Sequence, residues 1–196
     1  MMLSEINLET QSDKGTHHSY IDMYYEKTLA NYKDKTITLL EIGVNAGRSL
    51  ELWARYFNEN SKIIGIDKRM NVPYKPSRKN MHYIIGDATK EETVKKFNNI
   101  DIIIDDGGHT MNQQITTLKC CFPHLKNDGV FIVEDTHTSY WPQPWGGTFR
   151  GAGTFLEHSK RVTDILNQQH FQGTPIAEES LDFWISTTLL IRVLAI

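Results

Sequence analysis

The sequence predicts an α/β fold, in which a mostly parallel, open sheet carries helices on both faces. Two observations favour this fold. Short apolar runs rich in β-branched residues recur along the chain, and runs that are continuous rather than alternating are typical of strands buried on both faces of a parallel sheet. Segments with helical spacing separate these runs, so strand and helix alternate, as in sheets wound by right-handed crossovers.

The expected elements follow in chain order. Strands are expected at 37–42, 62–66, 100–104 and 129–133, with a weaker one at 82–85, and helices at about 19–31, after Gly47, around Thr93, at 114–125 and at 161–170. Residues 181–196 fit either a strand or an exposed tail. We expect one domain over 1–196, with an N-terminal helical segment at 1–34. Residues 137–155 are rich in Gly, Pro and Trp, which is typical of an irregular substrate loop or lid.

Composition excludes several classes of function. The chain has 196 residues, a net charge of −3 and no block of Lys and Arg, so we expect no nucleic-acid partner. No apolar run reaches the ~18 residues of a membrane-spanning helix, and the first residues lack a secretory pattern. The two cysteines, Cys120 and Cys121, are adjacent and fit free buried thiols. A soluble cytoplasmic protein is expected.

Three strand ends suggest a nucleoside site, because ligands of open α/β sheets bind beyond the carboxyl ends of the strands. Gly43 and Gly47 follow the first strand with the spacing GxxxG, whereas a dinucleotide site would need GxGxxG. Asp67 ends the second strand and could accept from ribose hydroxyls. Asp87 ends the third and could accept from an adenine amino group. A single match of this kind is more often a turn glycine or a capping carboxylate, but the three in order favour a nucleoside without phosphates.

The next two strand ends carry acids. Asp106 follows one strand, Glu134 and Asp135 follow the next, and like charges that close together require a cation to stay ionised. Oxygen ligands favour Mg²⁺, Ca²⁺ or Mn²⁺. The alternative is that these acids only cap turns. His109 lies three residues beyond Asp106 and is the candidate general base, with His137 as a second choice.

Motifs over about Ser12–Gly147 carry a resemblance to a known family. They are SDKGTHHSYIDMYYEKTL, LLEIGVNAGRSLELWARYF, IIGIDK, IDIIIDDGGH, FPHL and VEDTHTSYW. On these motifs the chain resembles the metal-dependent sugar O-methyltransferases of antibiotic biosynthesis, which act on macrolide and tetracenomycin sugars. The protein named as a cephalosporin hydroxylase is also similar. The macrolide enzymes carry a large N-terminal extension that helps them assemble and has no counterpart here, so their substrate and oligomeric state are not transferred.

The resemblance implies a Rossmann-like class I methyltransferase fold with S-adenosylmethionine as cofactor. It implies that Asp106, Glu134 and Asp135 hold Mg²⁺, or another hard divalent cation, and that His109 is the base. The expected cofactor-binding set is Lys14, Thr16, Glu41, Gly43, Asn45, Ser49, Asp67, Asp87, Ala88 and Asp105.

The expected function is therefore metal-assisted O-methylation of a hydroxyl on a sugar or a sugar-bearing natural product. Its partner would be a small-molecule sugar or glycosylated acceptor, and a homo-oligomer is an open expectation. One alternative is a metal-dependent hydroxylase, although an iron oxygenase uses two His and one carboxylate. The other is a nucleoside-binding protein without catalysis.

Overall fold

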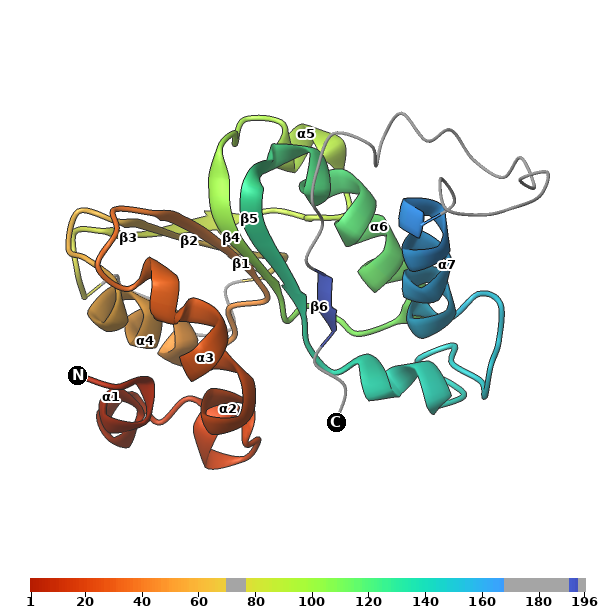
Figure 1. Ribbon diagram of the computed structural model, residues 1–196, viewed down its shortest axis with the longest axis horizontal. Helices are drawn as coiled ribbons and strands as arrows, with labels where there is room; N and C mark the ends of the chain where they lie inside the picture. The colour runs from red at the N-terminus through yellow and green to blue at the C-terminus, as the bar shows by residue number, and fades with distance from the viewer. Residues whose placement is uncertain (70–76, 168–190, 194–196) are drawn as a thin grey trace.

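The computed structural model describes residues 1–69, 77–167 and 191–193. Its centre is a six-stranded sheet in the order β3-β2-β1-β4-β5-β6, with every neighbouring pair parallel (Figure 1). The predicted Rossmann-like α/β fold is confirmed. The strands are β1 (Thr38–Ile42), β2 (Lys62–Asp67), β3 (Met81–Ile85), β4 (Ile100–Asp105), β5 (Leu125–Val133) and β6 (Ile191–Val193).

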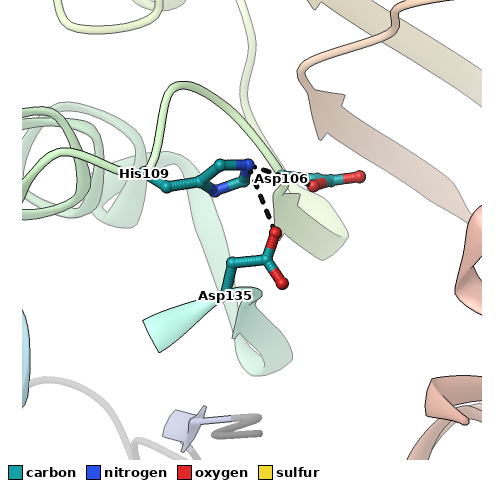
Figure 2. Close-up of side chains that lie close together, drawn as sticks. All are labelled: Asp106, His109 and Asp135. Atoms are coloured by element: carbon teal, nitrogen blue, oxygen red, sulfur yellow. Dashed lines mark ion pairs between the residues drawn. The ribbon is translucent and has the colours of Figure 1, made fainter. Parts of the chain in front are cut away.

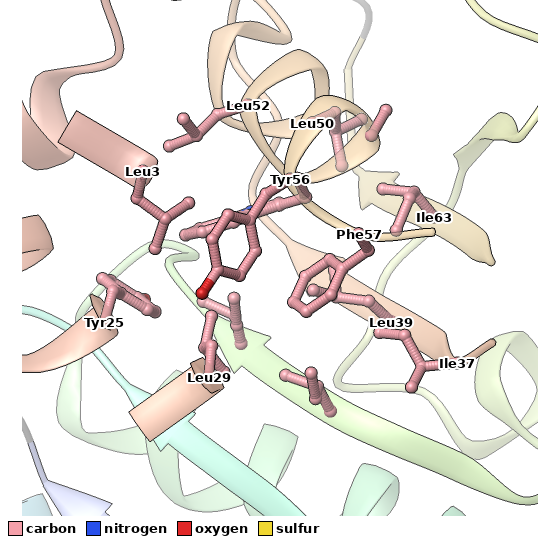
Figure 3. Close-up of a cluster of buried hydrophobic side chains, with 14 of the residues drawn as sticks. Leu3, Tyr25, Leu29, Ile37, Leu39, Leu50, Leu52, Tyr56, Phe57 and Ile63 are labelled. Atoms are coloured by element: carbon pink, nitrogen blue, oxygen red, sulfur yellow. The ribbon is translucent and has the colours of Figure 1, made fainter. Parts of the chain in front are cut away.

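Helices cover both faces of the sheet (Figure 1). Successive strand residues point to opposite faces, and here both faces are buried: Leu39 belongs to one apolar cluster and Leu40 to the other. The first cluster packs the sheet against the N-terminal helices and α4 (Arg48–Tyr56), as Figure 3 shows. The second packs it against α6 (Met111–Cys121) and α7 (Phe155–Asn167). Burial on both faces explains why the strands read as continuous apolar runs.

The N-terminal segment is more broken than the single helix expected at about 19–31. It comprises α1 (Leu3–Thr10), α2 (Asp13–Thr16), a π-helix η1 (Ile21–Tyr25), α3 (Glu26–Leu29) and a 3₁₀ turn η2 (Ala30–Tyr32). Asn7 fixes the turn between α1 and α2: its Oδ1 accepts from the Ser12 amide at 2.9 Å, and its Nδ2 donates to the Ser12 carbonyl at 3.0 Å. Gly15 packs so tightly against Asn7 and Ile21 that a side chain there would overlap both.

Other boundaries also differ from expectation. Helix α6 begins at Met111 because Thr110 caps it: the Thr110 hydroxyl accepts from the Gln113 amide at 3.3 Å. The short helix expected around Thr93 is α5 (Glu91–Val94), and β5 begins at Leu125 instead of at the expected residue 129. Its pairing with β4 is irregular at this start, since Ile100 pairs with Leu125 and Ile102 with Val130.

Towards the end of the chain, the expected helix at 161–170 is α7, which begins earlier, at Phe155. Of the expected terminal strand or tail at 181–196, the described residues form β6, parallel to β5. The rest of that range lies outside the described residues. Among the helices of residues 1–69 and 77–167, none is long and apolar enough to cross a membrane.

Candidate functional site at the carboxyl ends of the strands

A cavity of about 690 Å³ opens at the carboxyl ends of the strands, within the size range of small-molecule sites. The sheet order reverses between β1 and β4, and ligands of open α/β sheets bind at such a switch point. One end of the cavity is bounded by residues that follow β1, β2 and β3. The other end is bounded by residues that follow β4 and β5.

The loop from Gly43 to Gly47 lines the first end and requires its glycines. Gly43 has φ +85°, in the left-handed region, and a Cβ on it would overlap the carbonyl oxygen of Asp106. Gly43 therefore lets the loop after β1 lie directly against the loop after β4. Gly47, with φ +75°, precedes α4, so the amino end of that helix follows the loop.

Asp67 and Asp87 bound the same end, and each also stabilises local structure. Asp67 Oδ2 accepts from the amides of Val44 and Asn45, at 2.9 and 3.1 Å, and thereby holds the loop after β1. Asp87 Oδ1 accepts from the Thr89 hydroxyl at 2.6 Å, and its Oδ2 is 3.2 Å from the ammonium of Lys68. Burial works against ionisation of Asp87, but the Thr89 and Lys68 contacts leave its pKa lowered.

Asp106, His109 and Asp135 meet at the other end of the cavity (Figure 2). One ligand atom from each lies within 4.8 Å of the others. His109 Nε2 is 3.3 Å from Asp135 Oδ2 and 3.8 Å from Asp106 Oδ1. His109 Nδ1 is buried without a hydrogen-bond partner among the described residues. The imidazole thus presents Nε2 to two carboxylates that come from different strands.

Two of these residues hold an uncommon backbone conformation. His109 has φ +52° and Asp135 has φ +53°, both in the left-handed region. Non-glycine residues held there are concentrated at active sites and ligand clamps. The hydroxyl of Thr138 lies 2.8 Å from the carbonyl oxygen of His109 and 2.9 Å from that of Asp135, so it can donate to either. Thr138 therefore ties the two loops together.

A buried ion cluster lies beneath this end of the cavity. Lys14 is only 1% exposed, and its Nζ is 2.5 Å from Asp106 Oδ2, 2.8 Å from Glu134 Oε1 and 3.5 Å from Glu41 Oε1. Glu41 also accepts from the Ser49 hydroxyl at 2.9 Å. One ammonium thus faces three carboxylates, and a fourth, that of Asp135, lies within 4.8 Å of Asp106.

Burial, together with the neighbouring charges, shifts the pKa values of these groups. Burial and the neighbouring Asp106 raise the pKa of Glu134 to about 8, against the opposing effect of Lys14. Burial raises the pKa of Glu41 to about 7, although Lys14 opposes it. Burial also raises the pKa of Asp105 to about 7. Burial would lower the pKa of Lys14, but the surrounding carboxylates raise it above its usual value.

The donor set fits a hard divalent cation. Asp106, Glu134 and Asp135 all line the cavity, and their charge exceeds what Lys14 can neutralise. Carboxylate oxygens are the preferred ligands of Mg²⁺ and Ca²⁺. Asp106 turns Oδ2 towards Lys14 and Oδ1 towards His109, and Asp135 turns Oδ2 towards His109.

The segment that follows Asp135 in the chain is rich in aromatic side chains. The 3₁₀ helix η4 (Thr136–Tyr140) begins directly after Asp135. Its last residue, Tyr140, is 51% exposed, and Trp141 and Phe149 beyond it are 46% and 73% exposed. The ring of Trp145 lies 6.3 Å from that of His109, centroid to centroid. The Trp145 carbonyl accepts from the amide of Met111 at 3.1 Å, so the segment is anchored to the start of α6.

The structure brings most of the sequence-predicted residues to one cavity. Lys14, Glu41 and Asp105 do not line it and lie in the buried layer beneath. The sequence reasoning missed Tyr20 and Tyr25, whose hydroxyls donate to Asp135 and Glu134. The predicted residues that line the cavity are Thr16, Gly43, Asn45, Ser49, Asp67, Asp87, Ala88, Asp106, His109, Glu134 and Asp135.

Comparison with known proteins gives consistent matches. Residues 40–136 match a family described as a methyltransferase domain. The chain is 31% identical over 180 residues to 8-demethyl-8-alpha-L-rhamnosyl tetracenomycin-C 2'-O-methyltransferase of Streptomyces olivaceus, covering 86% of this chain and 47% of that protein. It is 28% identical over 193 residues to L-olivosyl-oleandolide 3-O-methyltransferase of Streptomyces antibioticus, covering 92% and 49%. The chain thus spans about half the length of the curated relatives it matches.

A solved structure shares this fold. The MycE methyltransferase from the mycinamycin biosynthetic pathway, in complex with Mg and SAH, superposes with a TM-score of 0.81 at 27% identity, covering 93% of this chain and 50% of that one. A second structure of MycE, with Mg, SAH and mycinamycin VI, gives a TM-score of 0.79 at 27% identity, covering 90% and 48%.

Proposed function

We propose that the chain, whose residues 40–136 match a family described as a methyltransferase domain, is an S-adenosylmethionine-dependent O-methyltransferase that uses a divalent cation such as Mg²⁺ to methylate a hydroxyl group. One observation carries the proposal. A single cavity has the glycine loop, Asp67 and Asp87 at one end, and His109 between two carboxylates at the other. A nucleoside held at the first end would share the cavity with an acceptor held at the second.

A cofactor and a cation would supply different parts of the chemistry. S-adenosylmethionine would supply the methyl group, and Mg²⁺ would supply a Lewis acid that lowers the pKa of an alcohol. Asp67 would accept from the ribose hydroxyls and Asp87, with the Ala88 backbone, would meet the adenine. Asp106, Glu134 and Asp135 would hold the cation.

His109 is the proposed proton acceptor. Its Nε2 faces Asp106 and Asp135, so a hydroxyl group held between these carboxylates can deliver its proton to that nitrogen. The left-handed conformation of His109 and the hydrogen bond from Thr138 to its carbonyl oxygen hold the backbone that carries the ring. Holding the base in place contributes to the alignment that an in-line displacement requires.

The acceptor is proposed to be a sugar or a glycosylated small molecule. The ring of Trp145 lies 6.3 Å from that of His109, and the exposed side chains of Tyr140, Trp141 and Phe149 belong to the same segment, so this segment offers apolar surfaces on which a sugar face could stack. Relatives named for sugar O-methylation support the same class of acceptor.

We further propose that residues 1–34 belong to the same methyltransferase unit. We also propose that the protein works in the cytoplasm, in keeping with its free Cys120 and Cys121.

The proposal is tested by methyl transfer from labelled S-adenosylmethionine to a panel of free and polyketide-linked deoxysugars. We expect label on a sugar hydroxyl with Mg²⁺, loss of transfer in excess EDTA, and recovery when Mg²⁺ is restored. Transfer that continues unchanged in EDTA would contradict the role of the cation. Transfer to an amine in preference to a hydroxyl would contradict O-methylation.

A further inference from the structure

The N-terminal segment contacts each of the three cavity carboxylates through a different side chain. Lys14 Nζ lies 2.5 Å from Asp106 Oδ2, and the Tyr20 hydroxyl donates to Asp135 Oδ1 at 2.6 Å. The Tyr25 hydroxyl donates to Glu134 Oε1. Lys14, Tyr20 and Tyr25 are each no more than 1% exposed.

At Asp106 and Asp135 the contacts leave the opposite carboxylate oxygen turned towards His109. Asp106 uses Oδ2 for Lys14, and its Oδ1 faces His109. Asp135 uses Oδ1 for Tyr20, and its Oδ2 faces His109. A carboxylate held through one oxygen has its rotation fixed, so the direction in which the other oxygen points is also fixed.

The π-helix explains how two tyrosines five residues apart can do this. In an α-helix, residues five apart differ by about 140° around the axis and face different ways. The Glu26 amide instead donates to the Ile21 carbonyl, an i→i+5 bond, and the wider turn brings Tyr20 and Tyr25 closer to one face. Such local π-helices occur frequently at functional sites. Packing against α4 also stabilises this conformation, because the centroid of the Tyr25 ring lies 4.9 Å from that of the Trp53 ring.

We propose that Lys14, Tyr20 and Tyr25 are positioning residues, which set the orientation of Asp106, Asp135 and Glu134 for a divalent cation. This inference rests on the proposed function. The tyrosines orient their carboxylates without neutralising them, and Lys14 offsets part of the repulsion within the cluster. Groups that orient metal ligands in this way commonly contribute 10–100-fold to metal affinity.

The test measures Mn²⁺ affinity directly, by electron paramagnetic resonance of free Mn²⁺, in the full chain without any acceptor. We expect Tyr20→Phe and Tyr25→Phe each to weaken Mn²⁺ binding about 10–100-fold. S-adenosylhomocysteine affinity, measured by calorimetry, should stay within about threefold, because the nucleoside lies at the other end of the cavity. The matched control is Tyr32→Phe, which also removes one hydrogen bond, to the Asp128 carbonyl at 2.9 Å, far from the carboxylates. It should bind Mn²⁺ like the wild type.

The outcomes separate the two proposals. Wild-type Mn²⁺ affinity in both folded tyrosine variants would overturn the positioning role and leave the proposed function intact. A wild-type chain that binds S-adenosylhomocysteine but no Mn²⁺ would overturn both the positioning role and the metal-assisted mechanism. Circular dichroism and thermal unfolding of each variant establish that any lost affinity belongs to a folded protein. If Tyr25→Phe does not fold, Tyr20→Phe decides the question alone.

Discussion

The imidazole Nε2 of His109 lies 3.3 Å from the Asp135 carboxylate, and both residues adopt left-handed backbone conformations at the ends of loops that Thr138 joins. A histidine so placed can act either as a proton acceptor or as a metal ligand, since its ligand atom falls within 4.8 Å of those of Asp106 and Asp135. The two roles predict different effects on Mn²⁺ affinity when the ring is removed.

His109→Ala should lower methyl-transfer turnover by about 10²–10⁴-fold, the usual contribution of a general base. Mn²⁺ and S-adenosylhomocysteine affinities should change little, because on this account neither depends on the ring. Turnover and both binding constants are measured on the same preparation. A large loss of Mn²⁺ affinity would instead identify His109 as a metal ligand.

Asp106→Ala should abolish Mg²⁺-dependent transfer while cofactor affinity remains near normal. The carboxylate meets the cation and the acceptor, whereas the nucleoside is held by residues after β1, β2 and β3. Calorimetry with S-adenosylhomocysteine and transfer assays with and without EDTA measure both effects. Wild-type turnover in this variant would mean that Asp106 serves only the fold.

Lys14→Met should lower the free energy of unfolding by about 3–5 kcal/mol in EDTA, because removing one partner leaves buried carboxylates without their counter-charge. Urea unfolding followed by circular dichroism measures this. The matched control is Lys160→Met, whose ion pair with Glu157 is on the surface, with Lys160 61% exposed. That change should cost no more than about 1 kcal/mol. Equal losses of unfolding free energy in the two variants would contradict a stabilising role for Lys14 in the buried cluster.

Gly43→Ala should destabilise the protein more than Gly146→Ala. Both glycines have positive φ, which costs another residue roughly 1–2 kcal/mol. A Cβ at Gly43 would also overlap the Asp106 carbonyl, whereas a Cβ at Gly146 would meet nothing within 4 Å. The difference between the losses of unfolding free energy in the two variants measures the cost of the overlap between a Cβ at residue 43 and the Asp106 carbonyl. Two equal losses would show that the loops after β1 and β4 do not need to touch.

The sequence was sufficient to predict the sheet, for a physical reason. Strands buried on both faces read as continuous apolar runs, and β1, β2 and β4 all show this pattern. The convergence of Asp67, Asp106 and Asp135 followed from the same inference, because parallel strands direct their carboxyl ends to one edge. Six strands in the observed order placed these residues around one cavity.

The N-terminal contacts could not be predicted in the same way. The expected helix at about 19–31 assumed α-helical spacing, which places Tyr20 and Tyr25 on different faces, and the π-helix changes that spacing. Lys14 was expected near the cofactor, yet it lies in the buried layer among carboxylates. Its contacts join residues 92 positions apart, beyond the reach of local patterns.

The central claim is that the strand-end cavity binds S-adenosylmethionine, and calorimetric titration of the chain with S-adenosylhomocysteine tests it most directly. We expect one binding site per chain, an affinity at least tenfold weaker in Asp67→Ala, which removes the proposed ribose acceptor, and no binding of NAD. Binding of NAD without binding of S-adenosylhomocysteine would contradict the claim.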